Sequence, residues 1–216
     1  MLLDHEGKSP TPKVRSLCAL CKTEIRAKCG KIVTWHWAHK AKECDPWSEP
    51  EGEWHRQWKI SAATLGADIE VVMGEHRADI VSISGHVIEL QNTYLTPEQI
   101  EEREAFYGED MVWVYRCHWI DRLNWGPRGF WWKHPAKSLT FHRRLVHWHV
   151  PEHKRPGKIW KADSKYPGHL VQRWEDFPEQ IWRVGLRLTH EQRVIGWIED
   201  VRDVEEWKIK HIVGAS

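Results

Sequence analysis

The sequence lacks any strong excess of charge. Its 216 residues include 32 Lys and Arg against 31 Asp and Glu, which gives a formal net charge of +1. A chain with so small a net charge creates no global field that would attract a polyanion. Binding to nucleic acid would therefore have to use a local basic patch.

Long hydrophobic runs are also missing. No stretch of 18 apolar residues occurs, and the first ten residues, MLLDHEGKSP, carry charges where a secretory signal needs an apolar segment. We therefore expect a cytoplasmic protein with no membrane partner. In that compartment the five cysteines are more typical of metal ligands or reduced thiols than of a disulfide framework.

Neither internal repeats nor low-complexity tracts are present, so the length allows one sizeable domain with small appendages. Shifts in composition divide the chain into four segments. We expect a flexible leader over 1–16, a zinc-finger-like unit over 17–46, a core over 47–150 and a C-terminal extension over 151–216.

The core segment shows alternating helix and strand patterns. Trp54, Trp58 and Ala62 recur at helical spacing until Gly66, with Asp45 and Ser48 as residues able to cap. The patterns that follow predict three strands, over 69–73, 77–83 and 87–90. They also predict a helix over 97–107, capped by Thr96 and ended by Gly108, and a further strand over 111–116. This order predicts an α/β core with helices packed on a mixed sheet. Residues 191–212 predict an amphipathic C-terminal helix.

Polar residues interrupt two of the apolar strands. Asp79 lies in the first, and Glu89 and Gln91 lie on one face of the second, because side chains alternate across a strand. Two carboxylates brought together repel unless a cation lies between them, and Mg²⁺ prefers such oxygen ligands. Either these acids hold a divalent metal, or they are acids at the sheet edge paired with a base such as Arg77.

Several motifs together resemble a known family. The order of a helix glutamate, a strand aspartate and E-x-Q, here Glu53, Asp79 and Glu89-Leu90-Gln91, resembles the PD-(D/E)XK nuclease core. More narrowly, the stretches EWHRQWK, HRADI, VIELQNTYLTPEQIEEREAFY and MVWVY are similar to the competence protein CoiA-like family, as are an N-terminal C-x-x-C and HWAH. The resemblance covers about residues 17–150.

The resemblance implies a restriction-endonuclease-like core that hydrolyses DNA, linked to DNA uptake, recombination or processing. In it, Asp79 and Glu89 would bind Mg²⁺ or Mn²⁺ with help from the Leu90 carbonyl, and Glu53 would join from the preceding helix. Gln91 stands where the broader nuclease pattern has a lysine, and glutamine can orient a water but cannot take its proton. Catalysis would then be slower, would recruit Lys59 or His55 from the helix, or would be absent.

Basic and aromatic residues suggest where DNA would bind. Arg103 and Tyr107 match the family's R-x-x-x-Y and are expected to contact a phosphate, unless Tyr107 belongs to the core. Between 142 and 161 lies a basic segment that would neutralise phosphates, or that is a solvated loop; it includes Arg143, Arg144, Lys154 and Arg155.

The Cys/His-rich segment has the composition of a structural zinc site. Cys18 and Cys21 are spaced so that both thiolates can face one ion. We expect His39 and Cys44 to complete the four ligands, with His36 as the alternative to one of them. A redox C-x-x-C and unmetallated thiols are the other interpretations.

Three functions are consistent with these patterns. The first is a metal-dependent DNA endonuclease with a structural Zn²⁺ and a catalytic Mg²⁺ or Mn²⁺. The second is a module that binds DNA in recombination without cutting it, for which Gln91 is the best argument. The third is a zinc-stabilised protein-interaction domain. The sequence assigns no role to the extension over 151–216. Its alternatives are an accessory lobe over the active site, a dimerisation element and a surface that docks a protein partner.

Overall fold

The computed structural model describes residues 3–31, 35–40, 44–49, 51–117, 124–126, 129–132, 142–150, 180–188 and 194–214. By internal contacts the chain forms two compact units. The first comprises Met1–Ile88 with His211–Ser216, and the second comprises Glu89–Lys210. Strand β6 (Val87–Gln91) runs from the first unit into the second.

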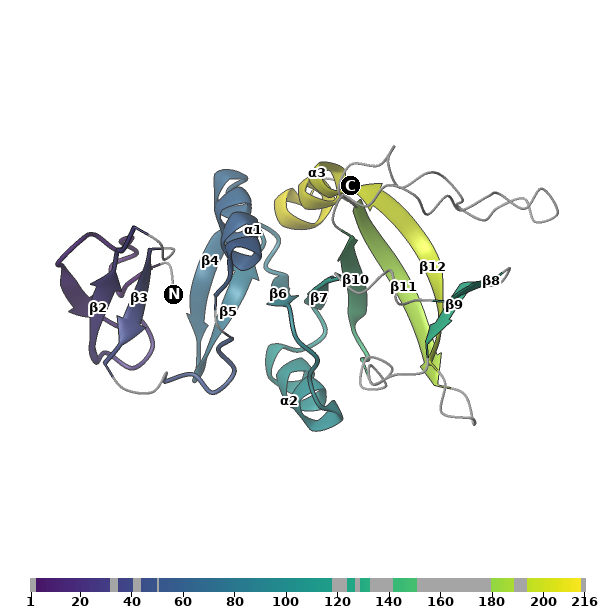
Figure 1. Ribbon diagram of the computed structural model, residues 1–216, viewed down its shortest axis with the longest axis horizontal. Helices are drawn as coiled ribbons and strands as arrows, with labels where there is room; N and C mark the ends of the chain where they lie inside the picture. The colour runs from purple at the N-terminus through teal and green to yellow at the C-terminus, as the bar shows by residue number, and fades with distance from the viewer. Residues whose placement is uncertain are drawn as a thin grey trace. The chain divides into compact units, whose positions relative to one another are not determined.

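A small antiparallel sheet begins the first unit. It contains β1 (Arg15–Leu17), β2 (Glu24–Lys28) and β3 (His36–His39), in that order (Figure 1). Its buried core consists of Cys18, Ile25 and Trp37. So small a core provides little folding energy, which is typical of domains that need a metal or another cross-link.

Helix α1, strands β4 and β5 and the first two residues of β6 also belong to the first unit. Helix α1 (Glu53–Thr64) buries Trp54, Trp58 and Ala62, as the sequence predicted. Strands β4 (Asp68–Met73) and β5 (His76–Val81) are antiparallel, and β5 pairs with the start of β6. Gly85 has a φ of 88°, a left-handed conformation that costs glycine little, and it closes the turn between β5 and β6.

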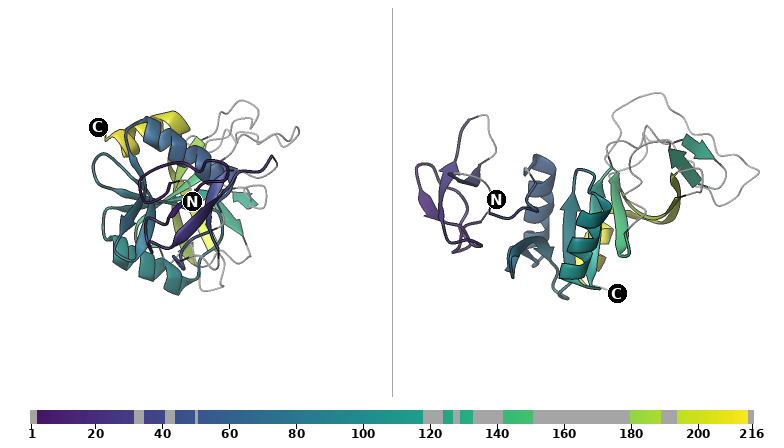
Figure 2. Two further views of the ribbon diagram at one scale, coloured as in Figure 1. Left: turned by 90° about the vertical axis from the view of Figure 1, so that its left-hand side faces the viewer. Right: turned by 90° about the horizontal axis from the view of Figure 1, so that it is seen from below.

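The second unit contains helix α2 and the remaining strands (Figure 2). Helix α2 (Pro97–Tyr107) begins with the predicted Thr96 cap, and Gln99 completes a capping box. Strand order continues from β6 through β7, β10, β11, β12, β9 and β8. Their bounds are Met111–Arg116, Leu145–Val150, Gln180–Leu188, Val194–Asp203, Gly129–Trp132 and Asn124–Gly126.

The sheet is mixed, because β7 and β10 are parallel whereas β10 and β11 are antiparallel. Trp113, Tyr115 and Trp148 are fully buried on these central strands. Predicted and observed elements agree over α1, β4, β5, β6, α2 and β7, so the chain has a mixed α/β core.

The predicted C-terminal helix, 191–212, is wrong over residues 194–203. Residues 194–203 form strand β12, which pairs with β11, and only Val204–Lys208 form an α-helix, α3. A π-helical segment, Ile209–Val213, follows. The apolar residues of 194–201 fit a helical stripe, but they include β-branched residues that also suit a strand, and the neighbouring strand β11 decides the outcome.

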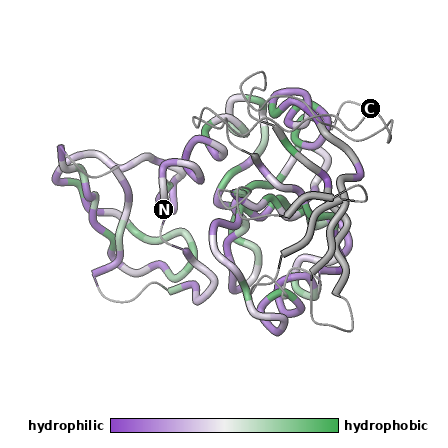
Figure 3. The backbone as a smooth tube through the Cα atoms, turned by 45° about the vertical axis from the view of Figure 1, so that its right-hand side comes forward, coloured by the Kyte–Doolittle hydropathy of each residue, from purple (hydrophilic) through white to green (hydrophobic). Residues whose placement is uncertain are grey.

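Hydrophobic residues lie in short stretches along the chain, interrupted by hydrophilic ones (Figure 3). Within the ranges described, none of the helices is both long and apolar enough to cross a membrane.

Candidate functional site

Four side chains of the first unit form a Cys/His cluster. The ligand atoms of Cys18, Cys21, His39 and Cys44 all lie within 4.8 Å of one another. Cys18 Sγ is 3.7 Å from Cys44 Sγ, and Cys21 Sγ is 3.3 Å from His39 Nε2. Three thiols and one imidazole are a common ligand set for structural zinc. This cluster, which contains the four residues predicted from the sequence, could hold a zinc ion.

Local backbone geometry explains why the two thiols of C-x-x-C meet. The Lys22 N–H donates to the Cys18 carbonyl oxygen (3.1 Å), and the Cys18 N–H donates to the Thr23 carbonyl oxygen (2.9 Å). Lys22 takes the left-handed conformation, with a φ of 58°. This tight turn places Cys21 back beside Cys18.

The surroundings shift the pKa values of Cys21 and Cys44 in opposite directions. Burial raises the pKa of Cys21, but hydrogen bonds with Thr23 and His39 outweigh it and lower that pKa to about 6. Burial, together with the neighbouring thiols, raises the pKa of Cys44 to about 12. Thiolates are the metal-binding form, and a bound cation would compensate for the cost of placing them together. His36, the alternative ligand, lies at the start of β3 outside the cluster.

A second cluster of the first unit is centred on Lys59, whose side chain is buried on α1. Its Nζ lies 2.9 Å from Asp79 Oδ1, 3.1 Å from Glu51 Oε1 and 3.2 Å from Glu70 Oε1. The three acids come from β5, from the segment before α1 and from β4. We call this group the Lys59 cluster.

Electrostatic attraction dominates this cluster. Burial lowers the pKa of Lys59, but the charges of Asp79, Glu70 and Glu51 outweigh it and raise that pKa. Burial raises the pKa of Glu70, whereas Lys59 and Arg77 lower it more strongly, to about 2. Lys59 and Glu70 are therefore both charged at neutral pH.

Sequence reasoning missed Glu51 and Glu70. Glu70 interrupts the apolar run of β4 just as Asp79 interrupts β5, so the same argument would have found it. Its φ of 54° is unusual for a residue other than glycine. No comparable signal marks Glu51, because it is one of several acids before α1.

Two residues expected from the resemblance lie elsewhere on α1. Glu53 is the first residue of the helix, and its side chain is 59% exposed. Its Oε2 lies 4.0 Å from Arg56 Nη1. Its Oε1 accepts a hydrogen bond from Gln57 Nε2 at 3.3 Å. His55 is buried, and its ring packs edge-on against Trp54. Lys59 is a residue of α1 whose side chain meets Asp79.

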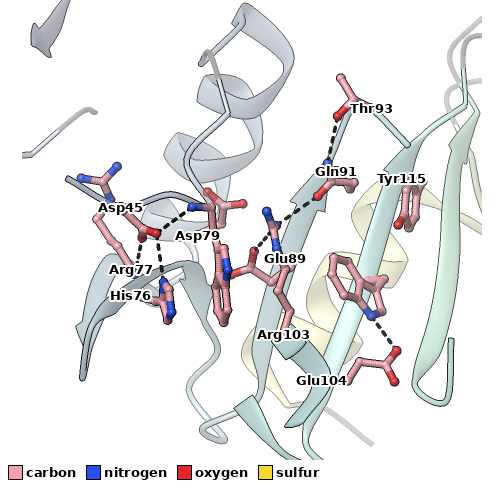
Figure 4. Close-up of polar contacts among 12 residues, drawn as sticks. Asp45, His76, Arg77, Asp79, Glu89, Gln91, Thr93, Arg103, Glu104 and Tyr115 are labelled. Atoms are coloured by element: carbon pink, nitrogen blue, oxygen red, sulfur yellow. Dashed lines mark hydrogen bonds and ion pairs between the residues drawn. The ribbon is translucent and has the colours of Figure 1, made fainter. Parts of the chain in front are cut away.

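In the second unit, Arg103 of α2 meets the polar residues of β6. Its Nη1 lies 3.7 Å from Glu89 Oε2 and donates to Gln91 Oε1 at 3.3 Å (Figure 4). Gln91 Nε2 in turn donates to Thr93 Oγ1 (3.3 Å). Glu89, Gln91 and Arg103 are all buried. The amide of Gln91 therefore has a fixed orientation, with its oxygen toward a permanent positive charge.

The other residues expected to bind DNA are spread along the chain. Tyr107 is half-buried at the end of α2 and packs edge-on against Phe106. Arg143 is exposed, with Glu101 at 3.7 Å, and Arg144 Nε donates to the Gly108 carbonyl oxygen. The remaining two predicted contacts lie outside the described residues; they are Lys154 and Arg155.

Glu104 organises the backbone around those arginines. Its buried carboxylate accepts hydrogen bonds from Trp113 Nε1 (3.0 Å) and from the backbone N–H groups of Arg143 and Arg144. His142 Nδ1 lies 3.2 Å from the same carboxylate, and His142 Nε2 is 3.0 Å from the Tyr115 hydroxyl. Burial lowers the pKa of His142. This network fixes the chain just before β10.

Comparison of the chain with models of protein families, with curated proteins and with solved structures finds no match. The function is therefore inferred from the residues of this chain, from their geometry and from the motif resemblance.

Proposed function

We propose that this protein is a metal-dependent DNA nuclease of the PD-(D/E)XK type. Glu53 lies on α1, Asp79 on β5 and Glu89 on β6, which is the motif order of a helix glutamate, a strand aspartate and E-x-Q. The acids of the motif occur on consecutive strands: Asp79 immediately precedes Ile80 on β5, and Glu89 immediately follows Ile88 on β6, and these two isoleucines are partners in the sheet.

The observation that carries the proposal is the contact between Lys59 and Asp79. A lysine is absent at position 91, yet the Lys59 Nζ lies 2.9 Å from Asp79 Oδ1. The ammonium group of Lys59 would supply the positive charge that the nuclease pattern takes from a lysine at the position of Gln91. Charge at a reaction centre that excludes water stabilises developing negative charge more strongly than charge in solvent.

The ligand chemistry suits a hard divalent cation. Asp79 and Glu89 would hold Mg²⁺ or Mn²⁺, which prefer carboxylate oxygens and which, when bound, activate water for hydrolysis. Each acid is compensated by a base in the structure, so a metal would compete with Lys59 and Arg103. The role of Lys59 is to offer its positive charge to a phosphate oxygen. Gln91 cannot accept a proton, so its contribution is to hold polar groups in place.

Cleavage of supercoiled plasmid and of labelled single-stranded DNA tests the proposal. Each substrate is incubated with the protein in Mg²⁺, Mn²⁺ or EDTA. We expect metal-dependent cutting that falls at least ~100-fold in Asp79→Asn and Glu89→Gln, because each loses a charged metal ligand. Lys59→Met should also cut slowly, whereas Lys59→Arg should retain part of the activity.

Glu75→Gln is the matched control. Glu75 is an exposed acid in the turn between β4 and β5, so its substitution removes a carboxylate without affecting the Lys59 cluster. All variants are first compared for zinc content and circular dichroism. Equal cutting by Asp79→Asn and the unmodified protein would identify a contaminating nuclease and contradict the proposal.

The contact between Arg103 and Glu89 favours a second candidate, a DNA-binding protein that does not cut. Arg103 neutralises Glu89 at 3.7 Å and engages Gln91 at 3.3 Å, so both polar residues of β6 have a structural partner. This candidate predicts DNA binding in EDTA that weakens steeply with salt, as phosphate contacts require, and no cleavage in either metal. Absence of both binding and cleavage would leave a protein-interaction domain.

A further inference from the structure

Asp45 connects the Cys/His cluster to strand β5. It directly follows Cys44, whose thiol belongs to the cluster, and it is buried. Both of its carboxylate oxygens are in use. Oδ2 accepts a hydrogen bond from the Arg77 backbone N–H at 3.0 Å, and Oδ1 lies 3.0 Å from His76 Nδ1 (Figure 4). The sequence suggested Asp45 as a helix cap, but α1 begins eight residues later, at Glu53.

An aromatic stack reinforces this connection. The Trp47 ring lies on the His76 ring, with centroids 3.3 Å apart and planes 2° from parallel. The Trp47 backbone N–H also donates to Asp45 Oδ1 at 2.9 Å. Asp45 and Trp47 therefore contact the first two residues of β5, Asp45 through its carboxylate and Trp47 through its stacked ring. Asp79 follows two residues along that strand, on the same face as Arg77.

A separate contact joins the N-terminal segment to the Lys59 cluster. The Leu3 backbone N–H donates to Glu70 Oε2 at 2.9 Å. The next residue, Asp4, is buried and accepts hydrogen bonds from the Glu6 and Lys8 backbone N–H groups and from the Ser16 hydroxyl. The segment that carries the Cys/His cluster thus contacts both strands that supply acids to Lys59.

We propose that Asp45 is a positioning residue through which zinc occupancy of the Cys/His cluster orders the start of β5 and, with it, Asp79. The small core around the cluster cannot maintain the fold of its segment without the ion, because metal-binding energy in such units is folding energy. Cys44 is fixed when it ligates, and Asp45 is one peptide unit away. Zinc loss releases Cys44, so the carboxylate of Asp45 no longer holds the Arg77 N–H.

The coupling can be measured without any enzymatic activity. Only its consequence for catalysis rests on the proposed nuclease function. Amide hydrogen exchange at Arg77, followed by NMR in the zinc-loaded and chelated protein, reports directly on the hydrogen bond to Asp45. We expect chelation to speed exchange at Arg77 at least ~10-fold, since the amide loses a charged acceptor.

The decisive variants are Asp45→Ala and Asp45→Asn, with Asp68→Asn as the control. Asp68 is an exposed carboxylate at the start of β4. Cobalt substituted for zinc gives an absorption spectrum of the thiolate site, which shows whether the cluster still binds metal. We expect both Asp45 variants to keep one metal per chain and an unchanged spectrum, with Arg77 exchanging fast whether or not metal is bound.

Three results would overturn the proposal. They are exchange at Arg77 that ignores zinc in the unmodified protein, zinc-dependent protection that persists in Asp45→Ala, and loss of metal binding in both Asp45 variants. The last would make Asp45 a support of the cluster itself. If the protein cuts DNA, Asp45→Ala should lower kcat at full zinc content. If it cuts none, the exchange data still decide whether the coupling exists.

Discussion

Replacement of Lys59 by Met removes a positive charge from the Lys59 cluster and keeps most of the volume of its aliphatic chain. The lost ammonium compensates three carboxylates at 2.9, 3.1 and 3.2 Å. The side chain of Glu70 is only 2% exposed, so water cannot replace the missing charge there. Removing one partner of a buried ion pair typically costs about 3–5 kcal/mol. We expect the free energy of unfolding to fall by that amount at pH 7.

The pH dependence of this loss follows from Glu70. Its pKa in the folded protein is about 2, below the ordinary 4.5, so its charge stabilises the fold above pH 4.5 and this stabilisation disappears as pH falls toward 2. Lys59→Met removes much of this lowering of the Glu70 pKa. The difference in stability between the variant and the unmodified protein should therefore be greatest near neutral pH and shrink between pH 4.5 and 2.

Urea denaturation followed by circular dichroism, repeated from pH 7 down to pH 3, measures this difference. Lys28→Met is the control, because Lys28 is exposed at the end of β2. It should change stability by less than about 0.5 kcal/mol. A loss in Lys59→Met no larger than in the control, or a loss that stays constant down to pH 3, would show that the contacts of Lys59 do not stabilise the fold.

Three further substitutions test other contacts. His39→Asn should abolish binding of one zinc per chain, measured by metal analysis after dialysis, whereas His36→Asn should keep it; loss in both would mean that His36 also ligates. In Glu104→Gln one of the two accepting oxygens becomes an NH₂ donor, so the free energy of unfolding measured in urea should fall by about 1–3 kcal/mol. The control, Glu102→Gln at an exposed position, should leave that free energy unchanged. Gln91→Lys places a second positive charge within reach of Arg103 and should lower the melting temperature without raising DNA cleavage; faster cleavage would show that Arg103 leaves room for the family lysine.

Local patterns in the sequence determined the elements of the core. Thr96, Pro97 and Gln99 satisfy the backbone groups at the start of α2 using residues within three positions, so no distant partner is needed. The turn at Gly85 likewise depends on one residue's freedom to adopt a positive φ. The cluster of Cys18, Cys21, His39 and Cys44 was also predictable, because C-x-x-C forms a knuckle locally. Between this motif and residue 46 only four further Cys and His residues occur, Cys29, His36, His39 and Cys44.

Only the tertiary structure decided which base meets which acid. The sequence placed Asp79 and Glu89 on strands but could not show that Lys59 compensates the first and Arg103 the second. Each of these ion pairs joins a helix residue to a strand residue that is distant from it in the sequence. The tertiary structure also decided the secondary structure of residues 194–203. Their apolar pattern suits a helix, yet hydrogen bonds from β11 make them a strand, because a strand is stable only beside a partner and a single sequence does not reveal that partner.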